Sequence, residues 1–147
     1  MNALDNGFAA LDGERPALVP PGSYDVAFER YYTWMMFGRA PKLTLCFRIV
    51  SMGEYFPQPL QRHYNVKKLI GRPANYGRFK VGFSCDFLHE FSVLFGTPQR
   101  LDRIPMSSFE KHILIAKVRT VSKGSSQREK PEGLQYSTIA ELTGIKQ

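Results

Sequence analysis

The order in which alternating segments follow one another is the feature of this sequence that most restricts its fold. Residues 23–28 and 42–50 alternate apolar with polar side chains, which is the period of a strand with one buried face. Residues 54–66 predict a third strand. Two prolines interrupt it and cannot donate to a ladder, so we expect an edge strand or a bulged loop there. Between the first two strands the alternation fails over residues 30–37, which predicts a bulge or a long exposed hairpin tip.

One helical segment follows, and two more alternating segments come after it. Residues 84–95 place apolar side chains at helical spacing, with Ser84 as the predicted cap and a Gly-Thr-Pro sequence at the end. Residues 112–121 and 134–142 alternate again. The polar, basic stretch 122–133 between them predicts a hairpin loop.

Three strands, a helix and a closing hairpin are the element order of the OB-fold, a five-stranded Greek-key barrel. We therefore expect a mainly β protein with an OB-like barrel and one helix between strands three and four. A chain of 147 residues fits one domain. We place that domain at residues 19–147, after a flexible leader at residues 1–18.

Cysteine use and hydropathy indicate a cytoplasmic protein. Cys46 and Cys85 stand in apolar contexts, and we expect reduced thiols rather than a disulfide. The N-terminal residues lack the basic start and apolar stretch of a signal peptide, and no apolar run is long enough to span a bilayer. We therefore expect no membrane partner.

The net charge of +7 is concentrated in the later part of the chain. Residues 56–147 hold fifteen Lys and Arg against seven Asp and Glu, and residues 55–85 hold no acidic residue at all. Like charges repel, so a segment of one sign is better suited to a polyanion than to solvent alone. The alternative is a basic loop without a partner. Residues 71–82 have no apolar period, and we interpret them as a mobile basic loop.

Binding of single-stranded nucleic acid requires cations that follow the phosphates and aromatic rings on which bases stack, at roughly 1–3 kcal/mol per base. Both kinds of residue occur together on the segments that would line an OB groove. The aromatic members of the predicted site are Tyr32, Trp34, Tyr64 and Tyr76. Its basic members are Arg30, Arg39, Lys42, Arg48, Arg62, Lys67, Lys68, Arg72, Arg78, Lys80, Lys117, Arg119, Lys123 and Arg128.

Catalytic and metal-binding patterns are not found in the sequence. The three histidines, His63, His89 and His112, have no partner at metal-ligand spacing. No serine stands in a nucleophile elbow, and no glycine-rich phosphate loop precedes the helix. We therefore expect a binding protein rather than an enzyme, with no catalytic residues, metal or cofactor.

Several segments resemble phage and plasmid single-stranded-DNA-binding proteins of the OB type. They are PPGSY at 20–24, PKLTLCFRI at 41–49, GEY at 53–55, KVRTV at 117–121 and YS at 136–137. The resemblance extends over about residues 18–142 and implies a protein that coats single strands during replication or recombination of mobile elements. Many bacterial single-strand binders end in an acidic tail that recruits partners. This chain ends in GIKQ, so recruitment by that route is not expected.

The expected function is therefore sequence-tolerant binding of single-stranded DNA in replication or recombination of a phage or plasmid. Replication or recombination proteins would be further partners, and homo-oligomerisation is left open. One alternative is a protein-interaction module, an accessory or inhibitor subunit whose contact patch would be residues 31–37. RNA binding is another, because it uses the same physical interactions.

Overall fold

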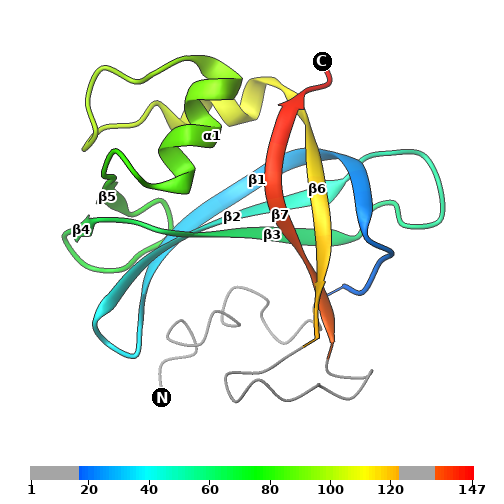
Figure 1. The fold of residues 1–147 in the computed structure, drawn as a ribbon, viewed down its shortest axis with the longest axis horizontal. Helices are drawn as coiled ribbons and strands as arrows, with labels where there is room; N and C mark the ends of the chain where they lie inside the picture. Colours follow the sequence, from blue (N-terminus) through cyan, green and yellow to red (C-terminus); the bar gives the residue numbers. More distant parts are fainter. Residues whose placement is uncertain (1–16, 123–134) are drawn as a thin grey trace.

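Five antiparallel strands form the main sheet of this computed structural model, which describes residues 17–122 and 135–147. Their order across the sheet is β3-β2-β1-β6-β7 (Figure 1). The expectation of a mainly β protein is confirmed. The strands are β1 (Gly22–Met36), β2 (Ala40–Ile49), β3 (Pro59–Asn65), β6 (Ile113–Val121) and β7 (Tyr136–Ile145).

Strand β1 is the longest strand and changes neighbours along its length. Its first half pairs with β6 as far as Ala27, and β2 pairs with it from Val26 to the end. The register with β2 shifts between Phe28 and Arg30, so a bulge is present, directly before the residues 30–37 for which it was predicted. The predicted exposed tip is wrong, because the strand continues through this segment to Met36.

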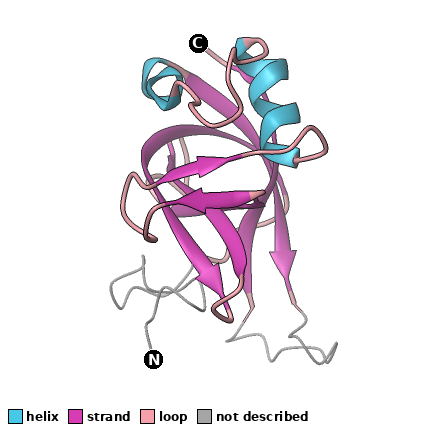
Figure 2. Cartoon of the chain, turned by 90° about the vertical axis from the view of Figure 1, so that its left-hand side faces the viewer, coloured by secondary structure: helices cyan, strands magenta, loops and turns pink. Residues whose placement is uncertain are grey.

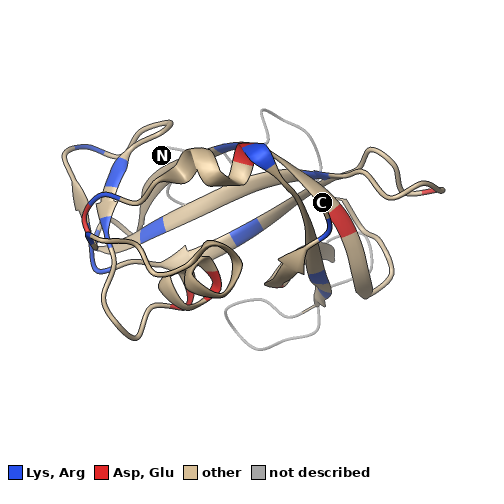
Figure 3. Ribbon diagram, turned by 90° about the horizontal axis from the view of Figure 1, so that it is seen from above, with Lys and Arg blue, Asp and Glu red and all other residues tan. Residues whose placement is uncertain are grey.

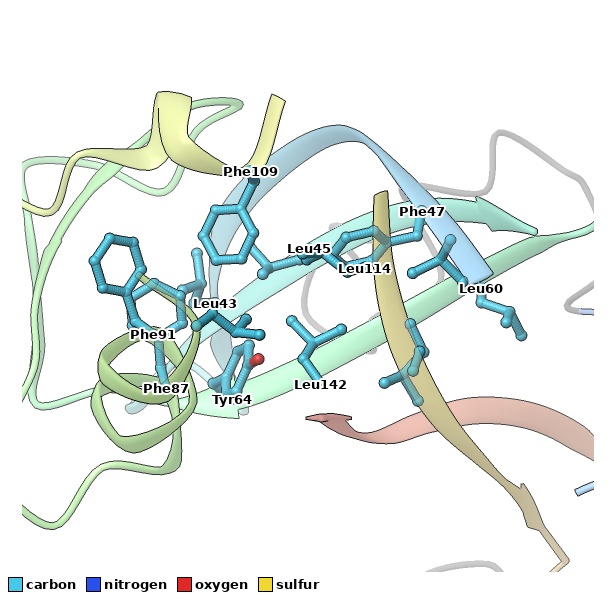
Figure 4. Close-up of a cluster of buried hydrophobic side chains, with 14 of the residues drawn as sticks. Leu43, Leu45, Phe47, Leu60, Tyr64, Phe87, Phe91, Phe109, Leu114 and Leu142 are labelled. Carbon is cyan, nitrogen blue, oxygen red and sulfur yellow. The ribbon is translucent and has the colours of Figure 1, made fainter. Parts of the chain in front are cut away.

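The hydrophobic core lies on one face of the sheet. All four side chains predicted to point inward from the second strand, at positions 43, 45, 47 and 49, are buried. Figure 4 shows three of them facing Leu114 of β6 and Leu142 of β7. Burying each large apolar side chain contributes about 1.5–3 kcal/mol. Helix α1 (Asp86–Phe95) closes one end of this core with Phe87 and Phe91.

The two edge strands of the sheet are linked by side chains rather than by a backbone ladder in the described residues. The Thr138 hydroxyl of β7 donates to the Gln61 carbonyl of β3 at 2.8 Å. The carboxylate of Glu90, on α1, accepts from the Tyr64 hydroxyl of β3 and from the Leu142 N–H of β7. The sheet therefore ends at β3 and β7, and a closed Greek-key barrel is not confirmed.

A second, two-stranded sheet was not predicted. The basic loop expected over residues 71–82 is wrong for residues 78–80, which form one of its strands. Strands β4 (Lys68–Ile70) and β5 (Arg78–Lys80) pair in antiparallel register. Figure 2 shows this hairpin lying in front of the main sheet. Each strand has only three residues, which is too short for an alternating pattern to be detected in the sequence.

Element boundaries differ from the predicted ones at several places. Helix α1 has Cys85, not Ser84, at its N-cap, and no side chain of the described residues caps it. Turns occupy residues 51–57, so β3 begins later than expected, at Pro59. A 3-10 helix, η3 (Met106–Lys111), was not predicted, and its Phe109 packs in the core.

The predicted leader and the predicted closing loop lie mostly outside the described residues. At the edge of the leader, Ala17 is buried, and its carbonyl accepts from the Ser137 N–H at 2.8 Å. The Val19 N–H donates to the Ser137 hydroxyl at 2.8 Å. Both contacts hold this segment against β7. Within the described residues, no helix is long and apolar enough to cross a membrane.

Candidate nucleic-acid interface

The β4–β5 hairpin has one apolar and one basic face. Its central pair, Leu69 and Phe79, packs against the core. Successive residues of a strand point to opposite faces. Lys68 therefore stands directly opposite Lys80 on the outer face, and Arg78 lies on the same face. Directly opposed side chains in an antiparallel pair have Cβ atoms about 5 Å apart. Three cations are thus held together by the backbone.

The charges on this outer face have no ion-pair partner among the described residues. The four described ion pairs are Arg48–Glu29, Arg62–Glu90, Arg100–Asp102 and Lys146–Asp25. Like charges placed directly opposite each other destabilise a strand pair. Figure 3 shows Lys and Arg gathered at the end of the molecule that carries β4 and β5 in Figure 1.

The carboxylate of Asp102 lies close enough to the hairpin for the charge of Lys80 to affect its pKa. The pKa of Asp102 is lowered, chiefly by its hydrogen bonds from Arg100 and to a smaller extent by the charge of Lys80. Arg100 already makes a two-point contact with Asp102, at 2.9 and 2.8 Å. The hairpin therefore keeps its positive potential.

The loop that joins β4 to β5 is bound to the edge of β1. The Thr33 N–H donates to the Ala74 carbonyl at 3.0 Å, and the Tyr76 N–H donates to the Tyr31 carbonyl at 2.9 Å. This is the edge that β6 leaves unpaired beyond Ala27. The loop protects that edge, since exposed strand edges pair with other chains. It also fixes the basic hairpin to the sheet.

Gly77 and Tyr76 of this loop show how closely it approaches β1. A Cβ on Gly77 would lie well inside contact distance of the Thr33 hydroxyl, so only glycine fits. The preceding residue, Tyr76, has a positive φ of 56° and is 54% exposed. Its ring meets Tyr31 edge-on at 5.1 Å between centroids. Tyr76 thus remains a candidate stacking residue, as predicted.

The other three predicted stacking residues are buried, which corrects the sequence-based site. Tyr32, Trp34 and Tyr64 are 1%, 3% and 3% exposed, so their rings cannot receive a base. The Trp34 indole donates to the Thr44 hydroxyl at 2.9 Å. Burial raises the pKa of Tyr32 to about 12. In the proposed contact patch, residues 31–37, only Phe37 is exposed, and the other residues are buried or half-buried.

Arg62 and Tyr64 belong to a buried network instead of a ligand site. Both donate to the Glu90 carboxylate, which the Leu142 N–H also reaches at 3.0 Å. The Arg62 guanidinium lies 4.2 Å from the centre of the Tyr64 ring. Burial, and then the charge of Glu90, raises the pKa of Tyr64 well above its ordinary range. Sequence reasoning missed Glu90, because a single acid in an apolar helix gives no signal of its partners.

A second group of the predicted cations lies on the outer face of β1 and β2. The strand register places Arg30, Lys42 and Arg48 on one face. Arg30 donates to the Asn75 side chain at 3.4 Å, and Lys42 donates to the Asn65 side chain. Arg48 is held by its ion pair with Glu29 at 2.8 Å.

The remaining predicted cations are more scattered. Those exposed in the described residues are Arg39 at the β1–β2 turn, Lys67 and Arg72 beside the hairpin, and Lys117 and Arg119 on β6. Lys123 and Arg128 lie outside the described residues. The structure therefore brings Lys68, Arg78 and Lys80 together on the hairpin. Lys117 and Arg119 form a separate group on β6.

A pocket of about 530 Å³ opens beside the hairpin at the start of α1. Lys67, Asn65 and Cys85 are among its lining residues. The Cys85 thiol donates to the Asn65 carbonyl at 2.9 Å, and burial raises its pKa. A raised pKa keeps a thiol protonated and unreactive. Next to the pocket, Phe83 is exposed.

No group of three or more His, Cys, Asp or Glu side chains in residues 17–122 and 135–147 could hold a metal ion. Searches of protein-family models, of curated proteins and of solved structures with this chain found no match. Its function is therefore inferred from its own residues.

Proposed function

We propose that this protein binds single-stranded DNA, with little sequence preference, along the basic face of the β4–β5 hairpin and the loop that joins its two strands. The proposal depends on one observation, the grouping of Lys68, Arg78 and Lys80 on one face of the hairpin. These cations stand together on a fixed hairpin without a carboxylate partner in the described residues. Phosphates supply the missing counter-charge. The exposed ring of Tyr76 beside them offers a face for a base.

The arrangement of the strands supports an OB-like barrel as part of this proposal. The long β1 pairs with both β2 and β6, and α1 lies between β3 and β6 along the chain. Glu90 and Thr138 bridge β3 and β7. OB-folds bind oligonucleotides on the face of their second and third strands, flanked by the loops that join the first strand to the second and the fourth to the fifth. In this chain the first of these loops corresponds to the β1–β2 turn, and the β4–β5 hairpin is an additional element between β3 and α1. A cytoplasmic role in replication or recombination of a mobile element is the process that the resemblance suggests.

The proposal is tested by the anisotropy of fluorescently labelled oligo-dT, titrated with the full chain at increasing salt. Each phosphate contact contributes roughly −0.7 to the slope of log K against log salt for single strands. Replacing Lys68 and Arg78 together by Gln is therefore expected to weaken binding and to make that slope shallower by about 1.4. The matched control replaces Lys111 and Lys146 by Gln, which removes the same charge elsewhere.

The control is expected to change the slope little. Binding that is absent at low salt, or indifferent to salt, contradicts the proposal. So does an equal loss in both double variants, because a general charge effect would then suffice. A matched oligo-rU strand in the same assay separates DNA from RNA.

A further inference from the structure

Two exposed aromatic residues share a backbone conformation that is unusual for their type. Phe37 and Tyr76 have φ angles of 53° and 56°, and they are the only non-glycine residues with positive φ in the described part of the chain. They are 78% and 54% exposed. Each is followed by Gly and then Arg, as Phe37-Gly38-Arg39 and Tyr76-Gly77-Arg78. We call these two segments the aromatic tips.

The first tip is the turn between β1 and β2. The Arg39 N–H donates to the Met36 carbonyl at 3.1 Å, and both central residues, Phe37 and Gly38, have positive φ. That is the signature of a type I′ turn, whose first central position is normally Asn, Asp or Gly. A bulky residue is strained there. Because Phe37 is so exposed, packing does little to compensate for this strain.

The second tip is the loop docked on β1. The Tyr76 N–H is fixed by the Tyr31 carbonyl, and the Gly77 N–H donates to the Ala74 carbonyl at 3.1 Å. The left-handed backbone turns the Tyr76 ring outward, where it touches Tyr31 edge-on. Here too a strained conformation leaves an aromatic ring in solvent.

Both tips are carried by the same strand. Tyr76 is bound at Tyr31, and Phe37 follows Tyr31 six residues later, just after β1 ends. At roughly 3.3 Å per residue the two attachment points are about 20 Å apart. Single-strand sites of about 4–16 nucleotides per OB domain are long enough to reach both. In Figure 1 the β1–β2 turn and the β4–β5 hairpin lie at the same end of the molecule.

We infer that Phe37 and Tyr76 are the two base-stacking positions of the single-strand site, with Arg39 and Arg78 contacting the adjacent phosphates. The inference rests on the function proposed above. The ligand is a strand with unpaired bases, because a ring at an exposed tip can stack only on a base whose face is free. Backbone strain at functional positions is commonly retained for such a purpose.

The test replaces Phe37 and Tyr76 together by Asn, a residue that tolerates positive φ. The fold is therefore expected to keep or raise its melting temperature. Binding of oligo-dT is expected to weaken about 10-fold or more, since stacking contributes 1–3 kcal/mol per base. The salt slope is expected to change little. Phe83→Asn, at an exposed aromatic outside both tips, is the matched control.

A second measurement uses an abasic strand of the same length, which keeps the phosphates and removes the bases. The wild-type protein is expected to prefer oligo-dT, and the double Asn variant to lose most of that preference. The Lys68 and Arg78 double variant should bind both strands more weakly and keep the preference. If the Asn variant binds oligo-dT like the wild type, or no more weakly than Phe83→Asn, the stacking inference is wrong while the proposed function stands. If the wild type does not bind oligo-dT, both are wrong.

Discussion

At His63 the fold makes an imidazole unusually difficult to protonate. Its Nδ1 lies 2.7 Å from the Thr44 hydroxyl. Burial first, and then the positive charges of Arg62, Lys42 and Arg119, lower the pKa of His63 to about 4, against 6.5 for a free histidine. Charges from β2, β3 and β6 therefore act together at this one position.

This shift predicts a pH dependence of stability. In the unfolded chain His63 takes up a proton near pH 6.5, whereas in the folded chain it does so only near pH 4. The free energy of unfolding should therefore be unaffected above pH 6.5 and fall, by roughly 1 kcal/mol per pH unit, as the pH drops toward 4. Urea unfolding of the wild type and His63→Gln checks this, with His89→Gln as control. Parallel profiles for the wild type and His63→Gln would contradict it.

Residue types alone were enough to name candidate DNA-contacting residues, but not to show which of them are accessible to solvent. Binding of a single strand requires both basic and aromatic residues, and the sequence contains them. In the structure Tyr76 is exposed, and Lys68, Arg78 and Lys80 lie together on one face of the hairpin. Trp34 could not be placed from the sequence, because its burial depends on a second cluster of side chains on the opposite face of the sheet.

At the scale of elements, the alternation of apolar and polar residues was sufficient to predict a strand that is long and has one buried face. Strand β2 has both properties, and its inward side chains were predicted. Strands β4 and β5 could not be predicted, because their pairing depends on the loop that docks on β1. Helical spacing predicted α1, whereas its cap depends on the path of the chain before it.

The docking of that loop predicts that Gly77→Ala is destabilising. The added Cβ would clash with the hydroxyl of Thr33, which is fully buried and cannot move aside. Overpacking of this kind costs about 1–3 kcal/mol. Urea unfolding measures the loss, and faster hydrogen exchange at the Thr33 N–H should accompany it. Gly82→Ala, where a Cβ meets open space, is the control. Equal stability of the two variants would show that the loop is not held as described.

At the scale of the whole molecule, Glu90 joins α1 to both edges of the sheet through Arg62, Tyr64 and Leu142. Glu90→Gln is therefore expected to lower the free energy of unfolding by about 3–5 kcal/mol, because Arg62 is left as an unpaired, largely buried charge. Urea unfolding checks this. The exposed pair of Arg48 with Glu29 gives the control, since Glu29→Gln should cost under about 1 kcal/mol. Similar losses in the two variants would mean that Glu90 is not the link.

The bulge in β1 has a consequence for the whole chain. Glu29 is the extra residue there, since Phe28 faces Phe47 and Arg30 faces Cys46. Without a bulge, strict alternation from Phe28 would turn Tyr32 and Trp34 toward the core, whereas deleting Glu29 would restore regular alternation and leave the later residues of β1 on their present faces. A one-residue deletion at the bulge should therefore be compatible with the fold, whereas a deletion later in β1 would turn the following side chains to the opposite face. Related proteins would be expected to differ in length at the bulge and in the loops, and to keep the rest of β1 at constant length.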